Sequence, residues 1–169
     1  MEMEELKDEM TGDIKTEYLE QYFGKKKDYY LPKLQALENG EKYSFNLNAF
    51  LFGVFWVLYR RMYFHVFILL LVAVAESKLE KILLDRLGNT YDMQMSLRLL
   101  WLIIFGTVLG NFGNYFFLEY SKKKVKKIIS TTDDEVIKMK KLKKSGSGNW
   151  IIIVSIALVL VLSLILGKK

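Results

Sequence analysis

Glycines and asparagines recur at helical spacing within one apolar stretch of this chain. Gly106 and Gly110 lie four residues apart, Gly113 follows, and Asn111 and Asn114 lie one helical turn apart. Small residues let helices approach closely, and amides buried in lipid bond across helices. We therefore expect a helix-packing or partner-docking stripe. The alternative is a polar pathway for an ion or solute, which one such stripe could line only in an oligomer.

Residues that support catalysis or metal binding are sparse. His65 is the only histidine and there is no cysteine, and a lone histidine without further ligands is a poor metal site. Paired carboxylates of hydrolytic type, phosphate loops and nucleophile elbows are absent from the sequence. The sequence thus predicts no catalytic residue, no metal and no cofactor, and a protein that is not an enzyme.

Charge is segregated along the 169 residues. Eight acidic and two basic residues fall between Met1 and Glu20, whereas Glu119 to Asn149 holds ten lysines against four acids. Lysines that flank apolar segments retain a loop on the cytoplasmic side and attract anionic lipid headgroups. This placement favours a membrane surface over nucleic acid as the partner of the lysines.

Two apolar segments are long enough to cross a bilayer. A spanning helix needs about 20 apolar residues, and residues 97–118 and 150–167 provide two such helices. Trp or Tyr near their ends suits the headgroup level.

The stretch from Asn46 to Ala75 allows two topologies, because Arg60 and Arg61 interrupt it. It could cross twice as a tight hairpin, which would place both arginines and then the lysine block outside. Alternatively, residues 46–60 form an interfacial or re-entrant helix and a span covers 61–84, followed by an external loop over 85–96. The positive-inside rule favours this second topology.

The predicted fold is therefore all-α. It is an integral membrane protein of the bacterial inner membrane with three spans, a cytoplasmic N-terminus and an external C-terminus. Six residues are expected to anchor it at the membrane interface: Trp56, Tyr59, Arg60, Arg61, Tyr63 and Trp150.

Short cytoplasmic helices are expected over residues 1–45 and in the lysine-rich segment 119–149. In the first, a narrow apolar stripe recurs every four residues and needs a partner; its members are Leu6, Met10, Ile14, Tyr18 and Tyr22. A second helix stops at Asn39 and Gly40, and its lysines and tyrosines suit either the membrane surface or packing on the other helices. Thr132 and Glu135 have capping-box spacing, and the following SGSGN predicts a flexible joint.

Four motifs in order resemble the small bacterial membrane proteins of domain of unknown function family 2628. They are YFGKKKDYYLPKL, FNLNAFLFGVFWVLYRRMY, FGNYFFLEYSKKKVKKI and KKSGSGNW, which together reach from Tyr22 to about Trp150. The family pattern corresponds here to Asn46, Ala49, Phe50, Gly53, Trp56, Tyr59, Arg60, Arg61, Met62 and Tyr63. Val54 stands where the family commonly has proline, so a proline kink is not expected there. The resemblance implies a small integral membrane protein and supplies no reaction.

Two functions fit these features. The first is a non-catalytic accessory or scaffold subunit of an inner-membrane complex, whose partners are other membrane subunits or further copies of itself. The alternative is a homo-oligomeric channel or small transporter with Asn111 and Asn114 facing a shared cavity.

Overall fold

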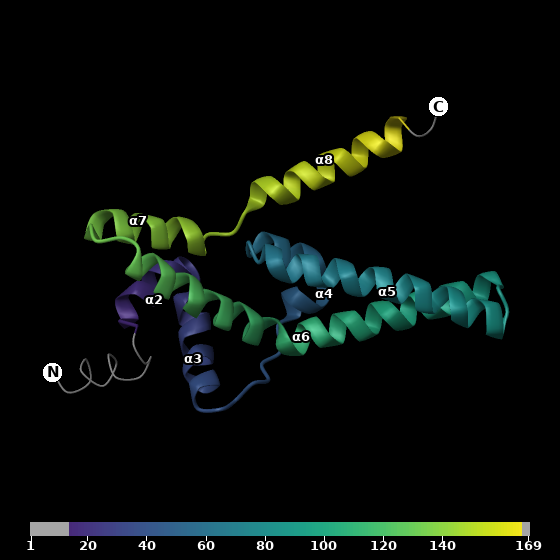
Figure 1. Ribbon diagram of the computed structural model, residues 1–169, viewed down its shortest axis with the longest axis horizontal. Coiled ribbons are helices and arrows are strands. Elements are labelled where there is room, and N and C mark those ends of the chain that lie inside the picture. The colour runs from purple at the N-terminus through teal and green to yellow at the C-terminus, as the bar shows by residue number, and fades with distance from the viewer. Residues whose placement is uncertain (1–13, 167–169) are drawn as a thin grey trace. The chain divides into compact units, whose positions relative to one another are not determined.

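The structure, a computed structural model, describes residues 14–166, and these residues contain helices and no strand. Figure 1 labels the helices, which are α2 (Thr16–Phe23), the short 3-10 helix η1 (Gly24–Lys26), α3 (Lys27–Glu38), α4 (Leu47–Tyr59), α5 (Tyr63–Leu87), α6 (Tyr91–Ser130), α7 (Glu135–Gly146) and α8 (Trp150–Leu166). The predicted all-α class is confirmed. By length and apolar composition, α6 is the one helix in this part of the chain that could cross a membrane.

The chain forms two compact units. The first comprises the described residues up to Phe45 together with Phe112–Asn149, and the second comprises Asn46–Asn111 and the described residues from Trp150 onward. Helix α6 contributes its N-terminal half to the second unit and its C-terminal half to the first.

The first unit has a core of its own, which the sequence did not lead us to expect. Leu19 and Leu34 are fully buried. Leu142 of α7 and Val125 of α6 are also fully buried, so four helices contribute to one apolar interior. An amphipathic helix gains most of its stability from such packing rather than from its own propensity.

The apolar stripe predicted for α2 is partly wrong. Leu6 and Met10 lie outside the described residues. Tyr22 and Ile14 are buried, but so are Leu19 and Phe23, which the stripe omitted. The buried face of α2 combines spacings of three and four residues, as a helix with 3.6 residues per turn requires.

Aromatic rings fill the space between α2, α3 and α6. The Tyr30 ring centroid lies 5.2 Å from that of Phe23 and 4.9 Å from that of Phe117. Tilted and offset ring pairs at such distances add to the free energy gained from apolar burial. Tyr30 therefore faces the other helices. The predicted stop of α3 is confirmed, with Asn39 as its C-cap and Gly40 at φ 96°.

Helix α7 begins differently from the prediction. Its N-cap is Asp134, whose carboxylate accepts a hydrogen bond from the Ile137 backbone N–H at 2.8 Å. Thr132 does not cap the helix; its side chain is buried and accepts a hydrogen bond from Lys141 at 3.0 Å. At the other end Gly146 is the last residue of α7, so the predicted flexible joint is confined to residues 147–149.

The ammonium group of Lys138 in α7 contacts the Tyr18 ring of α2. Its ammonium donates to the Glu135 carboxylate at 2.7 Å and lies 5.5 Å from the centroid of the Tyr18 ring. The hydrogen bond from Lys138 holds the pKa of Glu135 below its ordinary value, and the same bond raises the pKa of Lys138. A lysine from the predicted lipid-facing block is thus used within the protein.

In the second unit, α4 is broken in its middle. Gly53 has φ 49° and ψ −123°, a conformation outside the helical region that favours glycine. A kink therefore occurs although Val54 replaces the proline common in the family. The glycine itself supplies it.

A tight turn joins α4 to α5. The Arg61 N–H donates to the Leu58 carbonyl at 2.9 Å and the Met62 N–H to the Val57 carbonyl at 3.2 Å, which is the hydrogen-bond pattern of a Schellman cap. Arg61 occupies the left-handed position of this cap at φ 59°, where a residue other than glycine costs about 1 kcal/mol. Arg60 and Arg61 thus form the turn itself.

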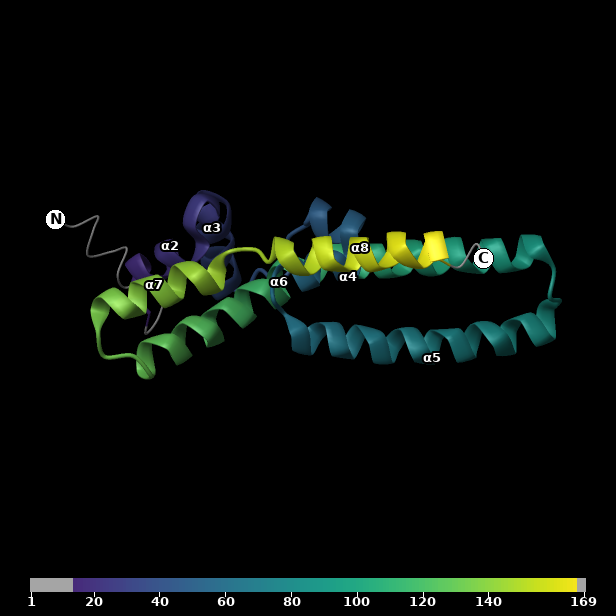
Figure 2. The ribbon, with the colours of Figure 1, turned by 90° about the horizontal axis from the view of Figure 1, so that it is seen from above.

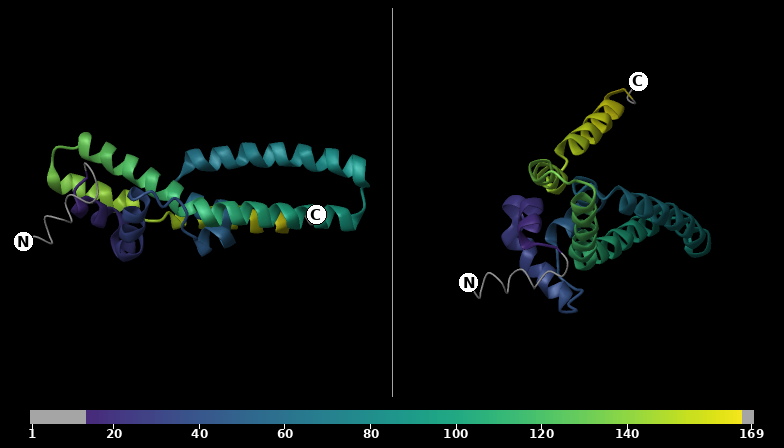
Figure 3. Two further views of the ribbon diagram at one scale, coloured as in Figure 1. Left: turned by 90° about the horizontal axis from the view of Figure 1, so that it is seen from below. Right: turned by 60° about the vertical axis from the view of Figure 1, so that its left-hand side comes forward.

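Helices α5 and α6 form an antiparallel hairpin in the second unit, as Figures 2 and 3 show. An ion pair between Arg98 and Glu80, at 4.0 Å, lies near the closed end of the hairpin. No residue of α5 is buried. Helix α8 contacts α4 through Trp150, whose ring centroid lies 5.0 Å from that of Tyr59.

We predict that Gly146→Ala separates α2 from α7. A Cβ at Gly146 would lie 1.7 Å from the Tyr22 carbonyl oxygen, and a backbone atom cannot swing aside as a side chain can. Overpacking of this kind costs about 1–3 kcal/mol or more. Limited trypsin digestion of the full chain in mild detergent should cleave faster near Lys25 and Lys143. Ser145→Ala is the matched control, and equal digestion of the two variants would contradict the prediction.

Candidate functional site

The glycine stripe of α6 receives α4. A Cβ at Gly106 would lie 3.2 Å from the Phe50 carbonyl oxygen and 3.3 Å from the Phe50 ring, closer than most Cβ contacts. One turn later, the Gly110 carbonyl accepts a hydrogen bond from the Asn46 N–H at 2.7 Å. The absence of a side chain at Gly106 therefore lets the α4 backbone approach α6.

Asn46 also starts α4. Its side-chain oxygen accepts a hydrogen bond from the Ala49 N–H at 3.0 Å, so it is the N-cap of the helix. Both Asn46 and Ala49 are buried, at 2% and 0% exposure. One residue thus begins the helix and attaches its start to the α6 backbone.

Asn114 is the buried polar centre of a contact in the first unit. Its amide donates to the Ser44 carbonyl at 3.0 Å, to the Ser44 hydroxyl at 3.2 Å and to the Tyr29 hydroxyl at 3.3 Å. A buried amide left without such partners would be strongly unfavourable. Asn114 therefore fixes the segment between α3 and α4 to α6.

Ser44 also accepts a hydrogen bond from Lys33. A serine beside a lysine is a nucleophile and base pair in some hydrolases. Here the Lys33 ammonium also lies 4.8 Å from the centroid of the Tyr29 ring, and a neutral amine would lose that cation–π attraction. The Ser44 hydroxyl thus accepts hydrogen bonds from both Lys33 and Asn114, which is a structural contact.

The remaining stripe residues act locally. The Asn111 side chain donates to the Thr107 carbonyl of its own helix at 2.8 Å and is half-buried. Gly113 is buried in the first unit. Asn111 and Asn114 therefore have different partners.

The predicted interface anchors differ in exposure. Trp56 and Arg60 are buried, at 5% and 7% exposure, whereas Tyr63 and Trp150 are exposed at 50% and 66%. The Arg60 guanidinium lies 6.0 Å from the Trp56 ring centroid and 5.6 Å from that of Tyr59. Arg61 and Tyr59 are half-buried.

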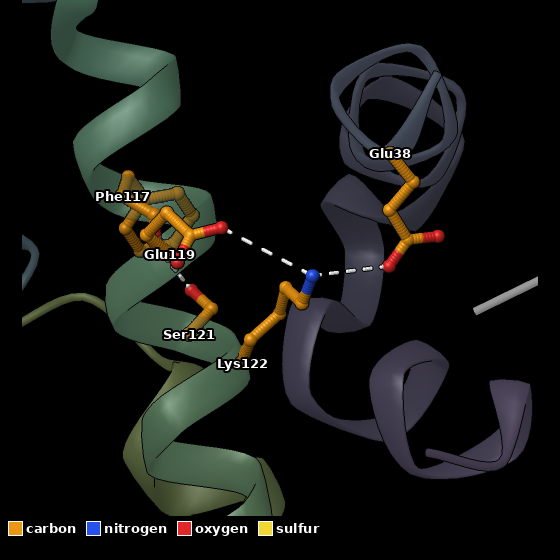
Figure 4. A network of polar contacts seen from close by, with 5 residues as sticks. All are labelled: Glu38, Phe117, Glu119, Ser121 and Lys122. Atoms are coloured by element: carbon orange, nitrogen blue, oxygen red, sulfur yellow. Dashed lines mark hydrogen bonds and ion pairs between the residues drawn. The ribbon is translucent and has the colours of Figure 1, made fainter. Parts of the chain in front are cut away.

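An ion network in the first unit ties the end of α3 to α6. The Lys122 ammonium lies 3.2 Å from a Glu38 carboxylate oxygen and 4.0 Å from one of Glu119, and Figure 4 shows it between the two. Next to Lys122 in the chain, the Ser121 hydroxyl donates to the carbonyl of Phe117, one turn earlier, at 2.7 Å. Lys122 is thus a second lysine of the basic block that is engaged within the protein.

Within residues 14–166, no three histidine, cysteine or acidic residues gather as a metal site. His65 lies in the first turn of α5, and its ring centroid is 6.2 Å from that of Phe64.

Sequence reasoning missed several residues of these contacts. Ser44 and Tyr29 gave no signal, because a partner 70 or more residues away cannot be read from local spacing. Asn46 did carry a signal, because asparagine directly before an apolar helical segment is a preferred N-cap residue, and its bond then goes to the backbone N–H of Ala49.

A model of the family described as "Protein of unknown function (DUF2628)" matches residues 15–119. This match confirms the resemblance drawn from the motifs, over a region that ends before the lysine block. No match to the chain was found among curated proteins or among solved structures.

We predict that Asn114→Leu loosens the segment before α4. The substitution keeps the volume but leaves the Ser44 carbonyl without its donor, at a cost of about 1–3 kcal/mol. Hydrogen exchange measured by mass spectrometry should rise in peptides that cover residues 41–49. Asn111→Leu is the matched control and should change that region little, because its amide bonds its own helix. Equal exchange in the two variants would sink the prediction.

Proposed function

The chain belongs to the DUF2628 family, and we propose that it is a three-span protein of the bacterial inner membrane that serves as a non-catalytic accessory or scaffold subunit. The observation that carries the proposal is the exposure of α5. Its apolar side chains, among them Phe64 at 72%, Phe67 at 55% and Leu71 at 52%, face away from the rest of the protein. Apolar surface of this extent marks a contact with lipid or with other subunits.

Three helices supply the proposed spans. Helix α6 has the required length and composition, and only 22% of its apolar window is buried, unlike the core helix of a soluble protein. The 25 residues of α5 extend about 37 Å, with four charges between Glu76 and Lys81 placed at its outer end. Helix α8 has 17 residues, 15 of them apolar, and can span with local thinning of the bilayer.

Charge sets the proposed orientation. Arg60, Arg61 and the ten lysines between Glu119 and Asn149 all fall on one side when α5, α6 and α8 cross in turn. The positive-inside rule places that side in the cytoplasm, and lysines such as Lys140 and Lys144, which are exposed on α7, would meet anionic lipid headgroups there. The C-terminus is then external.

The contacts of Asn114 and Asn111 favour a scaffold over a channel. Both amides are occupied by bonds within the protein, and a conducting pathway needs polar groups that face a shared cavity. Lys122 and Lys138 form ion pairs with Glu38 and Glu135 of the same chain, which favours a structural role for these lysines over a catalytic one.

The first test concerns topology. Alkaline phosphatase fused after Lys169 should be active, and a fluorescent reporter that matures only in the cytoplasm should be dark at the same position. In Arg60→Glu/Arg61→Glu double variants, loss of the positive charge should reverse or mix the orientation of α5. The matched control is Glu replacement of Lys78 and Lys81 at the other end of α5. Cytoplasmic fluorescence from the wild-type fusion would overturn the three-span proposal.

The second test concerns partners. Purification of the full chain in mild detergent should recover stoichiometric membrane proteins by mass spectrometry. Alanine at Phe64, Phe67 and Leu71 should reduce their recovery, because each 1.4 kcal/mol of binding free energy lost raises the dissociation constant about tenfold. Alanine at the exposed α8 residues Leu158, Val161 and Ile165 is the control. A monomer that is free of other proteins under several mild conditions would contradict the scaffold role.

Ion or solute flux through liposomes that disappears in Asn111→Leu/Asn114→Leu would support the channel instead.

A further inference from the structure

An apolar groove of about 370 Å³ lies in the second unit, among α4, α5 and α6. Its lining residues carry no charge, and they include Phe50, Gly53, Phe55, Ala73, Leu102 and Gly106. The groove is formed by the same α4–α6 contact that Gly106 permits.

Small residues at three places keep the groove open. Gly53 lies at the kink of α4, Gly106 lies under Phe50, and Ala73 presents a single methyl group from α5. A larger side chain at Gly53 or Ala73 would occupy space that is now part of the groove, whereas one at Gly106 would push Phe50 away from α6.

The size of the groove suits a hydrocarbon chain. An apolar cavity of about 150 Å³ holds one benzene molecule, so by the same ratio the groove holds about 15 carbon atoms. A long acyl chain fits this volume.

Positive charge lies at one end of the helices that form the groove. Arg60 and Arg61 are the only formally charged residues between Asn46 and Ala75, and Leu99–Asn111 of α6 has none. The Arg60 guanidinium rests on Trp56, the residue after the groove-lining Phe55. A ligand with an apolar chain and an anionic head would therefore find an apolar groove for its chain and positive charge at the α4–α5 turn for its head.

We propose that the groove binds one acyl chain of an anionic phospholipid whose phosphate lies against the Arg60–Arg61 turn. The proposal rests on the proposed membrane insertion, because the cytoplasmic leaflet would supply this lipid to the groove. In this proposal the kink of α4 shapes a lipid site.

Quenching of tryptophan fluorescence by phosphatidylglycerol with brominated acyl chains tests the site. Trp56 and Trp101 each adjoin a lining residue, Phe55 and Leu102, so they report bromine in the groove. In the full chain in neutral detergent, quenching should saturate near one lipid per protein. Ala73→Phe should weaken the apparent affinity at least tenfold, whereas Ala75→Phe, exposed on the same helix outside the groove, should bind as wild type.

The headgroup has its own measurement. Unlabelled phosphatidylglycerol should displace the brominated lipid from wild type several-fold better than phosphatidylcholine, and Arg61→Gln should remove the difference. This competition needs no groove variant, so it remains decisive if Ala73→Phe fails to fold. Equal displacement by the two lipids in wild type would overturn the proposal.

Three results would count against the groove site alone. They are quenching that grows without saturating, equal affinity in Ala73→Phe and Ala75→Phe, and quenching that falls as the protein concentration rises, which would indicate a second copy in the groove. Carbonate extraction separates these results from failure of the proposed function. A chain that resists extraction but shows one of them loses only the lipid site, whereas a chain released by carbonate loses the proposed spans as well.

Discussion

The attachment of the chain before α4 to the glycine and asparagine face of α6 is the constraint on which the rest depends. In the first unit Asn114 bonds Ser44, and in the second the Gly110 carbonyl accepts from the Asn46 N–H. Each bond involves a backbone group of the segment before α4, the Ser44 carbonyl or the Asn46 N–H, so the two bonds fix the path of the backbone there. Because Asn46 is also the N-cap of α4, the start of that helix is fixed in direction as well as in place.

Glycines then decide how closely the elements can approach. Gly106 admits the Phe50 backbone, Gly146 admits the Tyr22 backbone, and Gly53 bends α4. The three act differently: two remove a side chain from a contact, and one supplies a backbone conformation that other residues rarely adopt. Gly106 and Gly53 also border the apolar groove. Close packing of α4 on α6 and the space left beside it are consequences of the same small residues.

Much of the fold could be predicted from the sequence, because helical class and helix ends are local properties. The stop at Asn39 and Gly40 is confirmed, and the glycine stripe pointed to the right face of α6 for packing. What local spacing could not supply was the partner. Gly146 looked like part of a flexible joint because its contact, Tyr22, lies more than 120 residues earlier in the chain. The α2 stripe was incomplete for a related reason, since a period of four drifts from the true helical period and passes over Leu19 and Phe23.

The basic block shows why a charge pattern gives topology more readily than function. Lysine counts orient a membrane protein whatever each lysine touches, yet Lys122 pairs with Glu38 and Lys138 with Glu135 within the first unit. These two lysines stabilise helix contacts, while neighbours such as Lys140 and Lys144 stay exposed. An anionic bilayer would thus meet only part of the block. Arg60 and Arg61 belong to the other unit, where they form the turn between α4 and α5, and the Arg60 guanidinium lies 6.0 Å from the ring centroid of Trp56, which follows the groove-lining Phe55. In the proposed lipid site this pair, rather than the more numerous lysines, supplies the positive charge.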